Sequence, residues 1–426
     1  MTQHVRTESD APMTGDTPLL SSPPPVEQQL DLETWHMLGA HRPAPPLRIT
    51  YATTDDPNNI RAWSGTVHHI GRSLEMAGLE MDYLGHLARN RLFVNKAINK
   101  LSRISTFGEI FPSERTYRMA DLFAQRIRAH VKQGYSDVVF SPGSIPIALL
   151  KTKRPKVFYT DATFASILDI YPEWARYPKR YIDEGHDLER RALDNCDLAI
   201  YSSNWAARSA IDHYGIDPAR VRVVPFGGNL HQVPEQASVE RTIAERNTDV
   251  CELLFIGVAW ERKGGPKVME LARTLHEQGV RVRLHLVGSA PVGGDLPPYV
   301  VRHGFISKET DAGRARLSEL LSKAHFLLLP SMAECFGIVL CEANAFGVPA
   351  LANDVGGIPE IVKNGINGQL FAVDAPASEW ACTVVRWLTD RAAYGRLALS
   401  SRREYDHRLN WGVAGRTIRQ HLEALM

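Results

Sequence analysis

Short apolar runs alternate with helical patterns over most of the chain. The runs expected to form strands are "LRITYAT", "MDYLG", "SDVVFSPG", "KVFYTD", "LAIYSS" and "VRVVPFG", followed by "CELLFIG", "VRLHLVG", "YVVRHGF", "HFLLLP", "VPALA" and "GQLFAV". These runs are apolar without strict alternation, which is typical of parallel strands covered by helices on both faces. The pattern predicts an α/β protein of two successive doubly wound units, with a ligand site at the carboxyl ends of the strands.

Polar stretches between these patterns predict the domain boundaries. Residues 1–46 are rich in Ser, Thr, Asp and Pro and are expected to be a disordered tail. A first Rossmann-like domain is expected at 47–235, a polar linker at 236–250 and a second Rossmann-like domain at 251–404. The remaining segment, 405–426, is expected to be a helix that crosses back toward the first domain.

Composition argues against nucleic-acid binding, a zinc site and a membrane-spanning helix. The 426 residues carry a formal net charge of +1, so overall charge gives no attraction to nucleic acid. The 5 cysteines are scattered without CxxC spacing, which argues for reduced thiols and against a zinc site. No apolar run approaches the roughly 18 residues of a membrane helix, and no signal-peptide pattern is recognised, so a cytoplasmic location is expected.

The segment "PSMAECFGIVLCEANAFGVPA" carries two carboxylates, Glu334 and Glu342, in a run otherwise suited to burial. A strand should end at Pro330 and a helix should run from Ile338 to Phe346. Glu334 would then lie in the connecting loop and Glu342 about one turn into the helix. A carboxylate accepts hydrogen bonds from sugar hydroxyls but not from phosphate, so the pair suits a polyol.

Between these carboxylates, the backbone amides around Phe336, Gly337 and Ile338 would form a helix N-terminus, which favours electronegative ligand oxygens. Two acceptors flanking such donors would recognise a polyol joined to phosphates. The competing interpretation is that Glu334 is a solvated loop residue and Glu342 a helix-surface residue.

The E-x7-E spacing in "ECFGIVLCE" resembles the signature of the family 4 retaining glycosyltransferases. The resemblance implies a GT-B fold, in which two Rossmann-like domains face a central cleft, the first on the acceptor side and the second binding a nucleotide diphosphate sugar. It also implies that Glu334 orients the transferred sugar and that Glu342 binds the nucleotide ribose. Neither a cofactor nor a metal is expected in this family.

A second motif, "FIGVAWERKGGPKV", follows the first strand of the second unit. Arg262 and Lys263 place two cations beside a glycine pair, which suits a diphosphate. By resemblance, Gly257 lies at the donor site and Lys263 matches the family lysine. Val258 stands where the family usually has Arg, so the arginine role is assigned to Arg262. The alternative is an ordinary helix start with solvated charges.

Two features of the first unit match the acceptor side of this family. In "NNIRAWSGTVHHIGRSLEMAG", Gly65 resembles the glycine loop near the reacting sugar, and Ser64 replaces the usual first glycine. The neighbouring histidines, His68 and His69, are candidates for catalysis, although helical histidines more often serve packing. Asp161 ends a strand where many members carry a sugar-contacting His, so it is predicted either to contact the sugar or to cap the next helix.

A basic amphipathic segment at 89–103, within "LARNRLFVNKAINKLSR", suggests peripheral contact with the inner face of the membrane or with an anionic acceptor. The alternative is a surface helix of the acceptor-side domain.

The combined hypothesis is a retaining, metal-independent, hexosyl-type glycosyltransferase. It would move a sugar from a nucleotide sugar to an unidentified acceptor, namely a glycan, a lipid-linked glycan or a small molecule, in polysaccharide or glycoconjugate biosynthesis. By resemblance, the acceptor attacks the sugar carbon on the same face from which the phosphate departs. An oxygen of the leaving phosphate takes the acceptor proton, so no protein base is needed. The alternatives are a non-enzymatic nucleotide-sugar-binding module or another GT-B enzyme such as an epimerase. A dinucleotide dehydrogenase is disfavoured, because "TDDPNN" follows the first strand in place of a GxGxxG turn.

Overall fold

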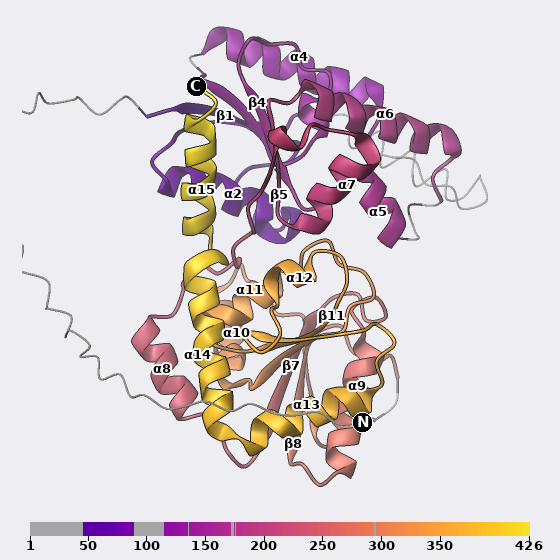
Figure 1. The fold of residues 1–426 in the computed structure, drawn as a ribbon, viewed down its shortest axis with the longest axis vertical. Coiled ribbons are helices and arrows are strands. Elements are labelled where there is room, and N and C mark those ends of the chain that lie inside the picture. The colour runs from indigo at the N-terminus through magenta and orange to yellow at the C-terminus, as the bar shows by residue number, and fades with distance from the viewer. Residues whose placement is uncertain (1–45, 89–114, 135, 172–173, 175, 294) are drawn as a thin grey trace, which may run out of the picture. The chain divides into compact units, whose positions relative to one another are not determined.

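The computed structural model describes residues 46–88, 115–134, 136–171, 174, 176–293 and 295–426. The predicted tail, except for its last residue, and the basic segment at 89–103 lie outside these ranges. Residues from Pro46 to Met426 belong to one compact unit, which contains two six-stranded parallel sheets (Figure 1).

The first sheet has the strand order β2-β1-β3-β4-β5-β6, and every neighbouring pair is parallel. Its strands are β1 (Arg48–Ala52), β2 (Glu80–Leu84), β3 (Val138–Ser141), β4 (Lys156–Thr160), β5 (Leu198–Tyr201) and β6 (Val221–Val223). Its helices are α2 (Thr66–Met76), α4 (Tyr117–Gln133), α5 (Phe164–Ile170), α6 (Lys179–Asn195) and α7 (Asn204–Tyr214), with short 3-10 turns η1 (Ala62–Gly65), η2 (Ile145–Ile147) and η4 (Pro218–Arg220). All residues of β3 and β5 are buried, because helices cover both faces of the sheet.

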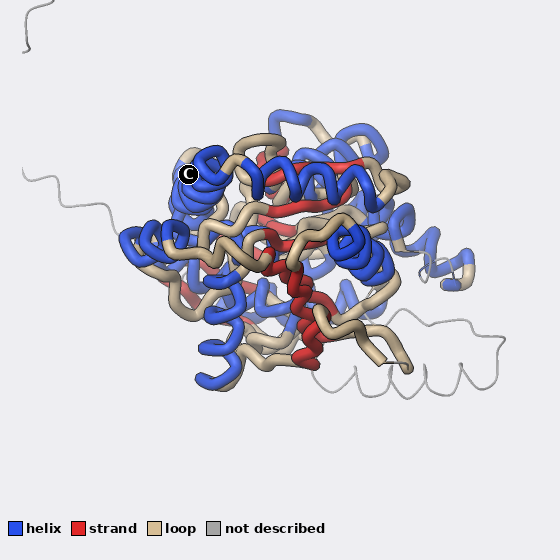
Figure 2. The backbone as a smooth tube through the Cα atoms, turned by 90° about the horizontal axis from the view of Figure 1, so that it is seen from below, coloured by secondary structure: helices blue, strands red, loops and turns tan. Residues whose placement is uncertain are grey.

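The second sheet has the order β12-β11-β10-β7-β8-β9 and is also parallel throughout. Its strands are β7 (Cys251–Gly257), β8 (Val282–Gly288), β9 (Val300–Gly304), β10 (Phe326–Leu329), β11 (Ala350–Asn353) and β12 (Gly368–Phe371). Its helices are α9 (Gly265–Glu277), α10 (Asp311–Lys323), α11 (Ile338–Ala345), α12 (Ile358–Ile361) and α13 (Ala377–Thr389). Figure 2 shows the strands of the protein flanked by helices. The predicted fold class, two doubly wound α/β units, is confirmed.

Between the two sheets, the segment expected as a linker contains α8 (Gln236–Ala244). After the second sheet, α14 (Arg391–Arg408) and α15 (Trp411–Glu423) follow end to end (Figure 1). Asn410 lies between them, and its side chain caps α15 by accepting from the Val413 amide at 3.0 Å. α15 packs on α2, and a Cβ on Gly415 would stand 2.0 Å from the Ser73 carbonyl oxygen. The last helix therefore belongs structurally to the first sheet.

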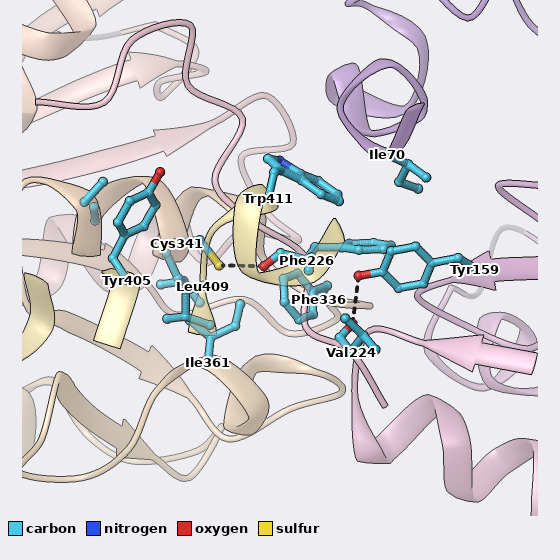
Figure 3. Close-up of a cluster of buried hydrophobic side chains, with 14 of the residues drawn as sticks. Ile70, Tyr159, Val224, Phe226, Phe336, Cys341, Ile361, Tyr405, Leu409 and Trp411 are labelled. Atoms are coloured by element: carbon cyan, nitrogen blue, oxygen red, sulfur yellow. Dashed lines mark hydrogen bonds between the residues drawn. The ribbon is translucent and has the colours of Figure 1, made fainter. Parts of the chain in front are cut away.

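A buried aromatic cluster joins residues from both halves of the chain. The Phe226 ring, fully buried, lies 4.7 Å from the Tyr159 ring, 5.2 Å from Phe336 and 5.5 Å from Trp411, measured between centroids (Figure 3). Trp63 meets the same ring edge-on at 5.5 Å. Phe336 lies two residues before the first residue of α11, so this cluster supports the loop that carries the predicted site.

Candidate active site

The predicted phosphate-binding lysine and sugar-orienting glutamate form an ion pair. Lys263 Nζ donates to Glu334 Oε2, and the two side chains are only 15% and 12% exposed. Arg262 lies on the same side, with its Nη1 3.9 Å from Glu334 Oε2 and donating to the Ala333 carbonyl at 2.9 Å. Two cations thus converge on one partly buried carboxylate, a setting that would attract a diphosphate.

This convergence depends on close backbone packing at Gly264. Its φ is +76°, and a Cβ there would stand 2.0 Å from the Pro330 carbonyl oxygen. At Gly257 a Cβ would lie 3.1 Å from Lys263 Cγ, so the glycine leaves room for the lysine stem. Val258, predicted to stand in the family's arginine position, is 71% exposed. Arg262 is thus the arginine of this motif that contacts the Glu334 loop.

A second glycine pair holds the Glu334 loop from the opposite side. A Cβ on Gly356 would stand 1.9 Å from the Glu334 carbonyl oxygen, and one on Gly357 would stand 2.1 Å from that of Cys335. The Gly357 amide also donates to the Glu334 carbonyl at 3.3 Å. These glycines are needed because two backbones touch here. The following Glu360 has a structural partner, accepting from the Asn204 amide at 3.0 Å.

Glu342 lies in α11 with 3% exposure, and Lys308 Nζ donates to its Oε1. The alternative that Glu342 is a helix-surface residue is therefore wrong. Sequence reasoning missed Lys308, which lies in the loop after β9. The available signal was its place near the carboxyl end of a parallel strand, where ligands of open α/β sheets bind.

The start of α11 has the geometry expected of an anion-binding terminus. Gly337 is its N-cap residue with φ +96°, a conformation that favours glycine. Phe336 is 1% exposed, so its side chain belongs to the core. Ile338 is half-buried and opens the helix. Backbone amides of a first helical turn lack partners within the helix and are available to ligand oxygens.

Asp161 follows β4 and is half-buried. Burial, together with the negative charge of Glu334, raises the pKa of its carboxyl to about 7, while hydrogen bonding from the Trp63 side chain acts in the opposite direction. The helix after β4 is capped by Thr163, whose Oγ1 accepts from the Ser166 amide at 3.1 Å. The capping role considered for Asp161 belongs to Thr163, and Asp161 faces the Glu334 side.

The loop Trp63–Gly65, predicted to lie on the acceptor side, has an unusual backbone. Trp63 and Ser64 adopt φ values of +47° and +56°, followed by Gly65 at +89°. Asn229 donates from Nδ2 to the Ser64 carbonyl at 2.8 Å and accepts at Oδ1 from Trp411 Nε1 at 2.9 Å. The serine substitution therefore keeps a left-handed loop, and neither Asn229 nor Trp411 was singled out from the sequence.

The two neighbouring histidines have packing partners. His68 Nδ1 lies 3.2 Å from the Pro57 carbonyl oxygen, and the His69 ring stacks on Trp411 at 6.0 Å. Burial, with smaller effects from His68, Lys308 and His231, lowers the pKa of His69 to about 4. A neutral, stacked imidazole fits packing better than proton transfer at neutral pH.

Tyr171 is a further contact that the sequence did not reveal. Its hydroxyl oxygen lies 3.5 Å from Cys335 Sγ, and its ring lies 5.4 Å from the Arg262 guanidinium carbon. Burial raises the pKa of the Cys335 thiol, so it remains a neutral packing group. All 5 cysteines have free thiols, as expected.

Within the described ranges, no helix is long and apolar enough to cross a membrane. In the same part of the chain, no group of three or more His, Cys, Asp or Glu side chains could hold a metal ion.

Solved structures share this architecture. Sucrose-phosphate synthase from Thermosynechococcus elongatus superposes with a TM-score of 0.63 at 18% identity, covering 89% of this chain and 99% of that one. HepE from Anabaena, in complex with UDP-glucose, gives 0.57 at 17% identity, covering 89% and 100%. At such low identity the likeness defines the fold alone. The protein has the two-domain GT-B fold of glycosyltransferases.

Sequence comparison gives the family. Residues 65–232 match "Glycosyltransferase Family 4" and residues 251–390 match "Glycosyl transferases group 1". These consecutive matches together cover most of the chain, which belongs to the family 4 glycosyltransferases. The family predicted from "ECFGIVLCE" is thereby confirmed.

Curated relatives are similar over more limited lengths. The D-inositol 3-phosphate glycosyltransferase of Geodermatophilus obscurus is 32% identical over 44% of this chain and 45% of its own length. The protein of the same name from Paenarthrobacter aurescens is 25% identical over 71% of this chain and 77% of its own length. The chain thus spans about half the length of the first of these relatives.

Proposed function

We propose that the protein is a retaining glycosyltransferase that moves a sugar from a nucleotide diphosphate sugar to an acceptor. The observation that carries the proposal is the convergence of Lys263 and Arg262 on Glu334, opposite Asp161. In glycosyl transfer, negative charge grows on the departing diphosphate while the sugar carbon becomes positively polarised. Fixed cations at the phosphate and a carboxylate at the sugar would stabilise that charge separation.

Each member of the site receives a role under this proposal. Lys263, Arg262 and the α11 amides would bind the diphosphate, Glu334 would orient the transferred sugar, and Glu342 would accept from the ribose hydroxyls. Asp161 would contact the sugar from the acceptor side. The fold neighbour HepE was solved with UDP-glucose, which supports a nucleotide sugar as donor. A leaving phosphate oxygen would take the acceptor proton, so no protein base is assigned.

The acceptor is approached through the curated relatives. Two proteins named D-inositol 3-phosphate glycosyltransferase share 25–32% identity with this chain, which makes an inositol phosphate the first acceptor to test. Phosphorylated small molecules and glycans form the rest of the panel. The cytoplasm, where nucleotide sugars are available, is the proposed location, and contact with the inner face of the membrane through residues 89–103 remains part of the proposal.

The test is a two-stage screen. Nucleotides and nucleotide sugars, beginning with UDP-glucose, are first scored by thermal stabilisation, since a ligand at about 100 times its dissociation constant adds about 2.7 kcal/mol. The stabilising donors are then offered to the acceptor panel, and product anomers are identified by NMR. We expect turnover with retained anomeric configuration. Donor binding without transfer or donor hydrolysis would point to a binding module, and an inverted product would overturn the retaining mechanism.

A further inference from the structure

We propose that Asn229 is a positioning residue that holds the strained Trp63–Ser64 loop in place for transfer, using the indole of Trp411 in α15 as its anchor. This inference rests on the proposed function, because it assigns the loop and Asp161 to the acceptor side of a glycosyl transfer site. The two hydrogen bonds of the Asn229 side chain link the last helix of the chain to the loop that precedes α2.

The Trp63–Ser64 loop is strained. Trp63 and Ser64 both occupy the left-handed region, at φ +47° and +56°, where side-chain-bearing residues are disfavoured. Such a conformation persists only when surrounding contacts hold it. The Ser64 side chain is exposed, so the carbonyl contact from Asn229 is the restraint that the described structure provides at that residue.

The two partners of Asn229 require an amide side chain. Asn229 and Trp411 are 4% and 5% exposed, so their polar atoms must be satisfied within the protein. An indole N–H can only donate, which fixes Oδ1 toward Trp411 and leaves Nδ2 to donate to Ser64. An amide meets both demands, whereas a carboxylate would turn an acceptor toward the Ser64 carbonyl oxygen. Asparagine is therefore specified at this position by its two partners.

The hydrogen bonds of Asn229 affect the reacting groups through Trp63. The Trp63 side chain acts on the Asp161 carboxyl and lowers its pKa, and its ring packs edge-on against Phe226, which also contacts Trp411. Displacing the loop would remove the indole from Asp161. The other titratable groups acting on or beside that carboxyl are Glu334, Cys335 and Tyr159. All three residues lie outside the Trp63–Ser64 loop.

Asn229 also contacts the donor side through Lys308. Lys308 Nζ lies 3.4 Å from the Asn229 carbonyl oxygen while also donating to Glu342. This contact uses the backbone of Asn229, so replacing the side chain leaves the Lys308–Glu342 pair intact. A variant of the side chain should consequently separate an effect on transfer from an effect on donor binding.

The experiment compares Asn229→Ala, Trp411→Phe and Ser64→Gly, together with the double variant of Asn229→Ala and Ser64→Gly. We expect Asn229→Ala to lower kcat by roughly tenfold to a hundredfold, the scale of a misplaced reacting group, with donor affinity unchanged within about twofold. Trp411→Phe keeps the ring but removes the N–H, so it should give a smaller loss of the same kind. It also serves as the folded alternative if Asn229→Ala is unstable.

Two readouts distinguish positioning from general support of the fold. Glycine tolerates φ > 0, so the kcat penalty of Asn229→Ala should shrink in the Ser64→Gly background. The pKa of Asp161, followed by NMR of carboxyl-labelled aspartate, should rise in Asn229→Ala because an opposing hydrogen bond is lost. Unchanged kcat and Asp161 pKa in both Asn229→Ala and Trp411→Phe, or an undiminished penalty beside glycine, would overturn the inference.

A matched control is Asn195→Ala. The Asn195 amide donates to the Ile147 and Leu150 carbonyls at 2.7 and 2.8 Å, at the end of α6 that leads into the amino end of β5. Its loss should lower the melting temperature without altering the Asp161 titration. If the wild-type protein turns over no nucleotide sugar at all, the proposed function fails, whereas the Asp161 titration still decides the role of Asn229.

Discussion

Lys308, in the loop after β9, forms an ion pair with Glu342, a buried carboxylate in α11. The pair places a cation over the group proposed to bind the ribose. A donor must therefore share Glu342 with Lys308, and the ion pair orients the carboxylate before the donor arrives.

Glu342→Gln should weaken donor binding by roughly 1.5 to 3 kcal/mol, because a hydrogen bond to a charged acceptor is replaced by a neutral one. Isothermal titration with UDP-glucose, or with whichever donor the screen selects, measures the change. Glu309→Gln is the control. Glu309 follows Lys308 in the same loop, and its exposed carboxylate pairs with Arg61. Equal donor affinity in Glu342→Gln and wild type would refute the ribose assignment.

Lys263→Ala should reduce kcat by about a hundredfold or more, the scale for removing one group that stabilises transition-state charge. The melting temperature should change far less, because Arg262 still lies 3.9 Å from the freed Glu334. Lys267→Ala offers a matched control in α9, the helix that follows Lys263, where the lysine donates to the Ala375 carbonyl at 2.9 Å. A wild-type rate in Lys263→Ala would rule out the phosphate role.

Asp161 should make folding stability depend on pH in a defined direction. Burial raises its pKa from 3.8 to about 7, so the folded state binds a proton more tightly than the unfolded state. Its contribution is therefore most favourable below about pH 4, declines as the pH rises, and is lost above about pH 7. His69, whose pKa is lowered to about 4, acts in the opposite sense below pH 6.5.

Because these effects oppose each other, the measurement is a difference between proteins. Melting temperatures of wild type and Asp161→Asn are compared at pH 5 and pH 8. The variant should gain relative to wild type on going from pH 5 to pH 8, since it lacks a carboxyl that must ionise. A constant difference across this range would show that the Asp161 pKa is close to normal.

Gly356→Ala should lower both stability and activity. A Cβ would meet the Glu334 carbonyl oxygen at 1.9 Å, and φ is +53°, so the loop carrying Glu334 must move. Gly395→Ala is the counterpart, because a Cβ there meets nothing within 4 Å and the residue lies inside α14. It should stabilise the protein by up to about 1 kcal/mol, the helix preference of Ala over Gly.

Chemical denaturation and steady-state rates check this pair of variants. Wild-type activity in Gly356→Ala would show that the Glu334 loop tolerates displacement, and would weaken its proposed role at the sugar.

The local patterns of the chain determined much of the fold. "HFLLLP" and "CELLFIG" predicted β10 and β7 because buried parallel strands need continuous apolar runs. Glu334 and Lys263 could be proposed as site residues because the family spacing marks them, but their pairing was not part of that pattern. The need for glycine at Gly356 and Gly357 is explained only by the folded structure, because the backbones of Glu334 and Cys335 leave no room for a Cβ there.

The tertiary structure alone decided which distant residues complete the site. Asn229, Trp411 and Tyr171 carry no local signal, and Lys308 is marked only by its place after a parallel strand. A lysine or an asparagine in a loop is ordinarily a solvated residue. Folding brings Trp411 to Asn229 across 182 positions of sequence. Apolar periodicity records which face of an element is buried and therefore predicts the sheets. The partners of a buried polar group depend on how those sheets pack, and no short stretch of sequence contains that information.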